Sequence, residues 1–180
     1  MDYFEKTVSS KKIYSGKVIN MRVDTVELPN GNLAERELVE HPGGVGIVAV
    51  DENGNVLLVE QFRKPYEKNI IEIPAGKLEK GEDVSECGMR ELQEETGYIA
   101  KSFEFLGECY PSVGYTDEVI RLFLATDLVK KEQNLDDDEF LSVIRIPVRE
   151  MLQKIMDNEV KDAKTAIGIL KACVKLGILN

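Results

Sequence analysis

The sequence is poor in histidine and cysteine, and it contains no long apolar run. Its single histidine, His41, weakens any hypothesis of a Ser-His or Cys-His catalytic pair. The three cysteines are odd in number and widely spaced, which fits neither a disulfide framework nor a zinc site and predicts reduced thiols in a cytoplasmic protein. The first residues, MDYFEKTVSSKK, lack the apolar core of a secretory signal, and no apolar run approaches the length of a membrane span.

The charge balance is strongly acidic. The formal net charge is −10 at pH 7, and no basic run is longer than a dipeptide. A protein that grips the phosphates of a nucleic acid normally carries a basic patch, so this function is not expected. The 180 residues, 43% of them hydrophobic, fit one soluble globular domain with at most a small extension. Such an acidic protein needs local arginines or bound cations if it handles an anionic substrate.

Hydrophobic patterning predicts strands first, one helix in the middle and two helices at the end, which indicates an α+β sandwich with a mixed sheet. Residues 11–40 contain two alternating runs joined at a strong hairpin signal, Pro29-Asn30-Gly31-Asn32. We expect residues 1–42 to form a small β-rich subdomain and residues 43–180 the main domain. Further strands are expected in VGIVAV, VLLVEQFR, IIEIP, FEFLGECYP, EVIRLFLATDL and LSVIRIPV, and helices in VREMLQKIMDNEV and AKTAIGILKACVKLGI, the last with Ile167, Leu170, Val174 and Leu176 in the core.

The stretch GKLEKGEDVSECGMRELQEETGY, residues 76–98, is crowded with carboxylates on one short predicted helix. If the helix covers residues 84–96, a step of about 100° per residue places Glu91 and Glu95 on the same face as Gly88 and Leu92. That face is expected to meet the sheet. Because carboxylates beside an apolar face are costly unless they are paired, this is not the pattern of a solvated surface.

Either an arginine or a metal ion would pair these acids. Arg90 can serve one carboxylate, whereas Glu91, Glu94 and Glu95 stand at positions i, i+3 and i+4 and exceed what one guanidinium is expected to satisfy. Ligands that are all oxygen select hard cations such as Mg²⁺ or Mn²⁺. The residues alone leave two readings, a metal site and a structural ion-pair network.

The same stretch resembles the Nudix box, G-x₅-E-x₇-R-E-(apolar)-x-E-E-x-G-(apolar), and departs from it only mildly, at Tyr98, where an aliphatic residue is commoner. The resemblance implies a Nudix hydrolase with a mixed β-sheet between helices, which cleaves a nucleoside diphosphate linked to another group. The matching positions are Gly76, Glu82, Arg90, Glu91, Leu92, Glu94, Glu95 and Gly97.

Carried over to this chain, the resemblance implies a Mg²⁺ site, with Mn²⁺ as an alternative. Glu91 and Glu95 resemble the metal ligands, Glu94 a third ligand or a water-bridged one, and the carbonyl of Ala75 a further ligand. Arg90 is implied to orient a glutamate of the box, with Glu82 as its support. Gly76 suits the tight loop before the helix and Gly97 the end of the helix.

Outside the box, RELVEHPGGVGIVAV, VLLVEQFRKP, IIEIPAGKLEKGE and YPSVGYTDE resemble the ADP-ribose pyrophosphatase branch of the family. This branch implies hydrolysis of ADP-ribose to AMP and ribose 5-phosphate by a homodimer that exchanges its N-terminal strands. One departure is Ser112-Val113-Gly114, where the branch commonly has S-P-G. A pyrophosphatase for nucleotide sugars or dinucleotides therefore stays open, as does a non-catalytic module that senses ADP-ribose.

Six further residues are candidates for substrate contact or catalysis. Arg63 offers a bidentate fork to a pyrophosphate, with a surface arginine at a strand end as the alternative. Arg36 and Glu37 are candidates to reach a nucleotide across the dimer, or form a plain hairpin ion pair, and Glu118 is a candidate contact of the terminal ribose. In the acidic run of residues 136–139, the resemblance implies that Asp136 and Glu139 are the candidates to orient or deprotonate the attacking water. A solvated turn is the alternative.

Overall fold

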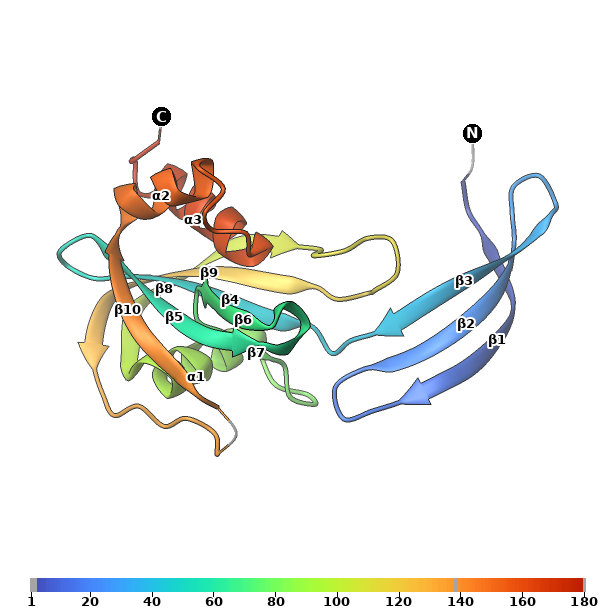
Figure 1. Cartoon of the computed structure of the whole chain (residues 1–180), viewed down its shortest axis with the longest axis horizontal. Helices are drawn as coiled ribbons and strands as arrows, with labels where there is room; N and C mark the ends of the chain where they lie inside the picture. Colours follow the sequence, from blue (N-terminus) through green and yellow to red (C-terminus); the bar gives the residue numbers. More distant parts are fainter. Residues whose placement is uncertain (1–2, 138, 180) are drawn as a thin grey trace. The chain divides into compact units, whose positions relative to one another are not determined.

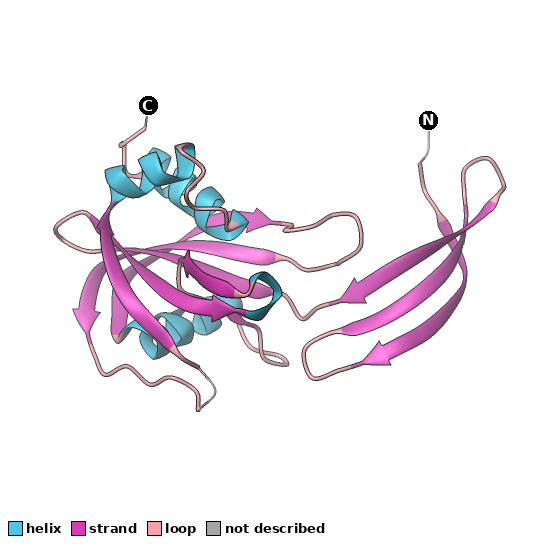
Figure 2. Cartoon of the chain, viewed as in Figure 1, coloured by secondary structure: helices cyan, strands magenta, loops and turns pink. Residues whose placement is uncertain are grey.

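The computed structural model describes residues 3–137 and 139–179, and its chain forms two compact units (Figures 1 and 2). The first unit comprises residues 1–43 and 110–119, and the second comprises residues 44–109 and 120–180. The predicted division into residues 1–42 and 43–180 did not anticipate that the loop 110–119 clusters with the N-terminal strands.

The first unit is a three-stranded antiparallel sheet of β1 (Lys6–Ser15), β2 (Asn20–Glu27) and β3 (Leu33–Glu40). The predicted hairpin between the second and third strands is confirmed: the amide of Leu28 donates to the carbonyl of Asn32, and Gly31 takes a positive φ of 82°. The first strand is longer than the sequence indicated. All ten residues of β1 are exposed, so its two faces show no difference in burial.

The loop 110–119 is tied to the end of β3 by backbone hydrogen bonds. The amide of Val39 donates to the carbonyl of Tyr115 at 2.7 Å, and the amide of Asp117 donates back to the carbonyl of Val39 at 3.2 Å. The amide of His41 then donates to the carboxylate of Asp117 at 2.8 Å. These bonds order the segment that carries Glu118.

The second unit is a mixed seven-stranded sheet with helices on both faces, which confirms the predicted fold class. Strands β4 and β9 are parallel, and the other pairs are antiparallel. The strand order is β10-β5-β4-β9-β8, with β6 beside β5 and β7 beside β4. The strands are β4 (Gly44–Val50), β5 (Asn55–Arg63), β6 (Lys68–Glu72), β7 (Ala75–Lys77), β8 (Tyr98–Cys109), β9 (Ile120–Lys130) and β10 (Leu141–Pro147).

Alternation along β4 divides the core into two layers. Val45, Ile47 and Ala49 pack toward α1 (Val84–Thr96), whereas Val48 and Val50 pack toward α2 (Val148–Met156) and α3 (Ala163–Lys175). Figure 1 shows α1 on one face of this sheet and the two C-terminal helices on the other. No helix within the described residues is long and apolar enough to cross a membrane.

The expected strand IIEIP is confirmed as part of β6, which ends at Glu72, and β7 is a further strand that the sequence pattern did not indicate. The predicted core face of the last helix is wrong in part. On α3, Val174 is 64% exposed and Leu176 39%, while the buried face is Thr165, Gly168, Ile169, Ala172 and Cys173. A Cβ on Gly168 would lie 3.0 Å from a methyl group of Val48, so small residues face the sheet because the helix approaches it closely.

Candidate active site

The carboxylate-rich helix has the predicted ends and the predicted buried face. It covers Val84–Thr96, the carboxylate of Asp83 caps its first turn by accepting the amides of Ser85 and Glu86, and Gly97 ends it with φ 70°. Glu91 is 8% exposed and Glu95 2%, so the expectation that both face the sheet is confirmed.

Glu95 is the most deeply buried acid of the helix. Its Oε2 accepts the amide of Ala75 at 3.0 Å. Burial raises the pKa of Glu95 to about 8; the amide of Ala75 opposes this shift, and the charges of Glu91 and Glu139 add to it. The surroundings of Glu95 supply too little positive charge to stabilise its ionised form, and a bound cation would supply it.

Glu91 lies directly against the loop that precedes the helix. A Cβ on Gly76 would lie 1.8 Å from Cδ of Glu91, so only glycine leaves room for this carboxylate. Burial raises the pKa of Glu91, and the charge of Arg90 partly offsets that effect. Gly76, the first residue of the box, is therefore required because the side chain of Glu91 occupies the space that a Cβ would need.

Arg90 connects three glutamates, which is more than the single carboxylate expected from the sequence. Its Nε and Nη2 donate to the two oxygens of Glu82 at 2.8 and 3.1 Å. Its Nη1 donates to Oε1 of Glu91 and to Oε2 of Glu94, both at 2.8 Å. The hydrogen bonds from Arg90 hold the pKa of Glu82 at about 2. Arg90 therefore organises the carboxylates of the box, with Glu82 fixing the guanidinium.

These residues fit a hard divalent cation by the chemistry of their donors. Among the described residues, no three acidic, histidine or cysteine side chains already converge as a metal cluster, because Glu91 and Glu94 turn toward Arg90 and Glu95 turns toward the amide of Ala75. Two buried carboxylates nevertheless lie close enough for the charge of one to raise the pKa of the other. Oxygen donors with excess negative charge suit Mg²⁺ or Mn²⁺. The carbonyl of Ala75 as a further ligand stays a prediction.

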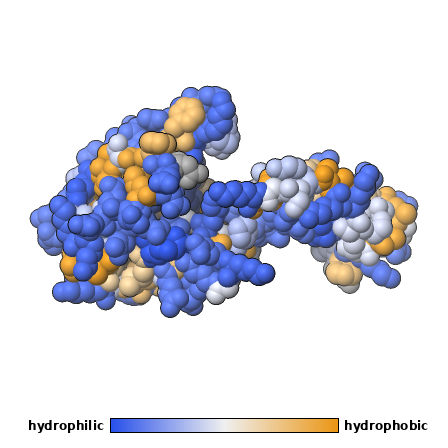
Figure 3. All heavy atoms as spheres, turned by 90° about the horizontal axis from the view of Figure 1, so that it is seen from below, coloured by the Kyte–Doolittle hydropathy of each residue, from blue (hydrophilic) through white to orange (hydrophobic). Residues whose placement is uncertain are grey.

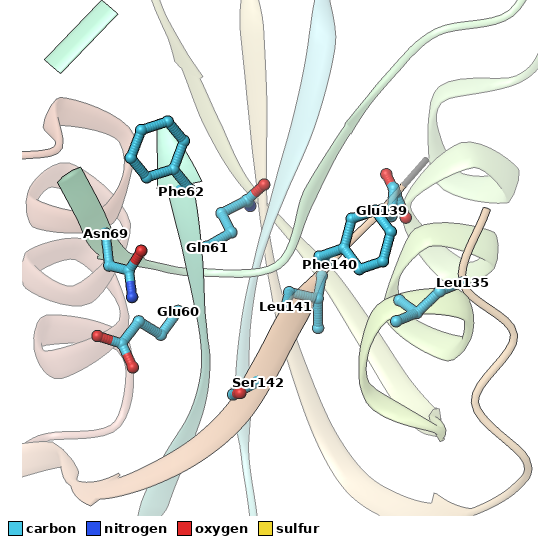
Figure 4. A pocket seen from close by; sticks show the side chains of 9 residues that line it. All are labelled: Glu60, Gln61, Phe62, Asn69, Leu135, Glu139, Phe140, Leu141 and Ser142. Atoms are coloured by element: carbon cyan, nitrogen blue, oxygen red, sulfur yellow. The ribbon is translucent and has the colours of Figure 1, made fainter. Parts of the chain in front are cut away.

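A pocket of about 440 Å³ has Glu139 as part of its lining (Figure 4). The charge of Glu139 contributes to the raised pKa values of both Glu91 and Glu95, which places it within electrostatic reach of the helix. Asp136 is exposed, and its carbonyl accepts the amide of Glu139 at 3.0 Å. The pocket is lined by Glu60, Gln61, Phe62, Asn69, Leu135, Glu139, Phe140, Leu141 and Ser142.

Arg63, the predicted pyrophosphate contact, is held by a buried carboxylate. Its Nε and Nη2 donate to the two oxygens of Glu72 at 2.6 and 2.8 Å, and Arg63 keeps 39% of its side chain exposed. Lys164, at the start of α3, pairs with the same carboxylate. Sequence reasoning missed Glu72 and Lys164. The only signal was an acid between isoleucines in IIEIP, and nothing identified its partner on a distant helix.

Replacing Glu72 by glutamine is expected to lower the free energy of unfolding at pH 7 by about 2–3 kcal/mol, because it leaves Lys164 and Arg63 without their shared carboxylate. The estimate is at the low end for a buried pair because Arg63 is 39% exposed. Burial alone would raise the pKa of Glu72, but Arg63 and Lys164 overcome this effect and lower it. The stabilisation is therefore present above the usual pKa of 4.5 and is lost as the pH falls through the lowered value.

Denaturant unfolding of both proteins between pH 7 and pH 3 measures this difference. It should shrink toward low pH, since protonated Glu72 resembles glutamine. Glu67→Gln is the matched control, because Glu67 pairs with Lys64 at the surface, where the two side chains are 65% and 82% exposed. A difference that stayed constant with pH would contradict the assignment.

The three remaining candidates belong to the first unit. Arg36 donates from Nε and Nη2 to the carboxylate of Glu5 at 2.8 and 2.6 Å, so its ion-pair partner is Glu5 and not Glu37. Glu37 is exposed and, as the next residue of β3, points to the opposite face of the sheet. Glu118 lies 3.7 Å from Nδ1 of His41. Within this unit the structure does not bring the three together.

Comparison with known proteins agrees with the fold and the box. Residues 40–166 match the NUDIX domain, and residues 5–39 match the nucleoside diphosphate sugar hydrolase N-terminal domain. The chain therefore belongs to the Nudix family and is a Nudix hydrolase.

Its relatives include two proteins from Bacillus, each 47% identical over 92% of this chain and 90% of the relative: the ADP-ribose pyrophosphatase of Bacillus subtilis (strain 168) and the methanol dehydrogenase activator of Bacillus methanolicus. The ADP-ribose pyrophosphatase of Mycobacterium tuberculosis (strain ATCC 25618 / H37Rv) is 33% identical over 92% of this chain and 81% of that protein. A crystal structure of an ADP compounds hydrolase has the same fold, with a TM-score of 0.85 over 96% of this chain and 94% of that chain at 21% identity.

Proposed function

We propose that this protein hydrolyses the pyrophosphate bond of ADP-ribose, giving AMP and ribose 5-phosphate, with Mg²⁺ as its cofactor and Mn²⁺ as an alternative. The observation that carries the proposal is the pair of buried glutamates, Glu91 and Glu95, on the face of α1 beside the loop of Ala75 and Gly76. Relatives named ADP-ribose pyrophosphatase that match 92% of this chain support the choice of substrate.

In this proposal Glu91, Glu94, Glu95 and the carbonyl of Ala75 hold the metal. When bound, the metal neutralises the charge of the pyrophosphate and acidifies a coordinated water. Arg90 keeps the carboxylates in place from the side of the helix through its bonds to Glu82, Glu91 and Glu94. The protein thus acts mainly by positioning groups and by placing positive charge where the reaction develops negative charge.

The proton of the attacking water goes to a carboxylate of the loop between β9 and β10. Glu139 is the stronger candidate because it lines the pocket and its charge reaches Glu91 and Glu95, whereas Asp136 is exposed outside the pocket lining. Loss of this proton generates the hydroxide that attacks phosphorus, and the bond between phosphorus and the bridging oxygen breaks. The released phosphate ends are those of AMP and ribose 5-phosphate.

Charge and exposure support Arg63 as a contact of the substrate. Arg63 is partly exposed at the end of β5, where Glu72 orients its fork, and we assign it to the pyrophosphate. Arg36, Glu37 and Glu118 belong to the first unit and are assigned to the nucleotide and the terminal ribose of a substrate bound by a dimer. Their arrangement within one chain does not form a site, which fits a role completed by a second copy.

A homodimer is part of the proposal. Apolar side chains on the strands of the first unit are exposed, namely Val8 at 56%, Ile13 at 50% and Leu33 at 64%. Figure 3 shows orange surface on this unit as well as on the larger one. A thin sheet with exposed apolar residues supports pairing with a second copy. The three free cysteines support a reducing compartment, the cytoplasm.

The test is hydrolysis of ADP-ribose by the purified protein with Mg²⁺, followed by separation of the nucleotides. AMP is expected to appear, and EDTA is expected to abolish its release because the carboxylates alone repel the substrate. Restoration by added Mg²⁺ or Mn²⁺ is the control. Binding of ADP-ribose without turnover under any of these metals would instead indicate a sensing module.

A second candidate is hydrolysis of a nucleotide sugar. It is favoured by the match of residues 5–39 to the nucleoside diphosphate sugar hydrolase N-terminal domain. The GDP-mannose pyrophosphatase of Yersinia enterocolitica serotype O:8 / biotype 1B (strain NCTC 13174 / 8081) is 35% identical over 72% of this chain. Including GDP-mannose and a dinucleotide in the same assay compares the candidates directly. A kcat/KM for either that exceeds the value for ADP-ribose would replace the proposed substrate but keep the chemistry.

A further inference from the structure

The first residues of the loop between β9 and β10 contact the C-terminal end of α1. The amide of Lys131 donates to the carbonyl of Gly97 at 2.8 Å, and the amide of Asn134 donates to the carbonyl of Glu94 at 3.1 Å. Between them, Nε2 of Gln133 donates to the carbonyl of Glu95 at 2.5 Å. The last carbonyls of a helix have no partner within the helix, so this loop supplies donors that α1 itself lacks.

The contact is close as well as hydrogen-bonded. A Cβ on Gly97 would lie 3.2 Å from the amide nitrogen of Gln133 and 3.2 Å from the carbonyl of Lys131. The glycine that ends the helix therefore also leaves room for the loop. Since residues 131–134 are attached to α1, only a short stretch of the loop remains before β10 begins at Leu141.

The rest of the loop carries Glu139, whose charge contributes to the raised pKa values of Glu91 and Glu95. Leu135, Glu139 and Phe140 line the pocket together with residues of β5, β6 and β10 (Figure 4). The position of Glu139 relative to Glu91 and Glu95 is thus set at one end by pairing of Leu141 with Gln61 and at the other by the attachment to α1. Gln133 is the only side chain of residues 131–134 for which the structure describes a hydrogen bond to this helix.

We propose that Gln133 is a positioning residue: by donating to the carbonyl of Glu95 it fixes the loop so that Glu139 stands over the buried glutamates of α1. This inference rests on the proposed function, because it assigns Gln133 a role that acts through Glu139. The backbone carbonyl and the catalytic carboxylate belong to the same residue, Glu95. A displacement of the loop therefore moves Glu139 relative to the carboxylate of Glu95.

The first experiment compares three variants by kcat/KM and by thermal unfolding. Gln133→Met keeps the length and removes the donor, and it is expected to lower kcat/KM about tenfold with a Tm within a few degrees of the original. Gln133→Lys restores a donor and places positive charge at a helix C-terminus, so it is expected to stay within about twofold. Gln153→Met is the matched control, because Nε2 of Gln153, on α2, donates to the exposed carboxylate of Asp157 just after that helix.

The second experiment is a double-mutant cycle with Glu139→Gln. If Gln133 acts through Glu139, adding Gln133→Met to Glu139→Gln should change kcat/KM by less than about twofold. Equal losses in both backgrounds would overturn the inference, as would loss of activity in Gln133→Lys equal to that in Gln133→Met. A wild type without turnover of ADP-ribose would refute the proposed substrate instead, and the cycle would then be measured on whichever nucleoside diphosphate derivative is hydrolysed.

Discussion

Glu95→Gln is expected to lower kcat for ADP-ribose hydrolysis by about a thousandfold or more while the protein stays folded. Glutamine has nearly the same shape and can still accept the amide of Ala75, which now bonds Oε2 of Glu95 at 3.0 Å. It carries no charge, so it holds a divalent cation poorly. The side chain is 2% exposed, and removal of a buried charge with few partners is not expected to lower the Tm.

The matched control for this variant is Glu86→Gln on the same helix. Glu86 is exposed, on the side of α1 away from the sheet, so both activity and stability are expected to stay unchanged. Steady-state assays over a range of Mg²⁺ concentrations separate the two effects, since loss of a ligand raises the concentration of metal that is needed. Full activity of Glu95→Gln with an unchanged Mg²⁺ requirement would refute the assignment of Glu95 as a ligand.

Gly76→Ala is expected to lower kcat/KM by about a hundredfold and the free energy of unfolding by about 1–3 kcal/mol. The added methyl group would lie 1.8 Å from Cδ of Glu91, so the carboxylate must leave its position. Glu91 is 8% exposed and bonds Arg90, and its displacement therefore disturbs a metal ligand and the arginine network together. Kinetics and denaturant unfolding measure the two effects.

A second substitution tests the cause of that loss. Gly76→Ala combined with Glu91→Ala removes the side chain with which the new methyl group collides. The double variant is expected to lose less free energy of unfolding than the two single variants lose in sum. Its activity is expected to stay low because the ligand is absent. Additive losses of stability would mean that the methyl group disturbs something other than Glu91.

The local features of this protein follow closely from its sequence. Helix α1 has the predicted bounds, and Glu91 and Glu95 are buried as the helical spacing indicated. The hairpin between β2 and β3 lies where two alternating runs meet turn residues. These features depend on neighbouring residues alone, since the period of a helix or strand and the chemistry of a turn are set within a few positions.

Features that depend on distant contacts did not follow from the sequence. The carboxylate of Glu72 pairs with Lys164, which lies 92 positions away, and that of Glu5 with Arg36, 31 positions away. At the last helix, Ile167 packs against the core as expected, whereas Val174 and Leu176 are exposed and the small residues Gly168 and Cys173 are buried instead. Close approach of a helix to a sheet favours small side chains, and closeness is a property of the packed fold.

The loop 110–119 also limits where the chain can be truncated. It emerges from β8 and returns into β9 in the sheet of the second unit, yet its backbone pairs with Val39 and its Asp117 accepts the amide of His41. A version truncated at residue 43 would leave Tyr115 and Asp117 without these partners. The N-terminal strands therefore cannot be removed as a separate module, or exchanged for those of another protein, unless this loop is redesigned with them.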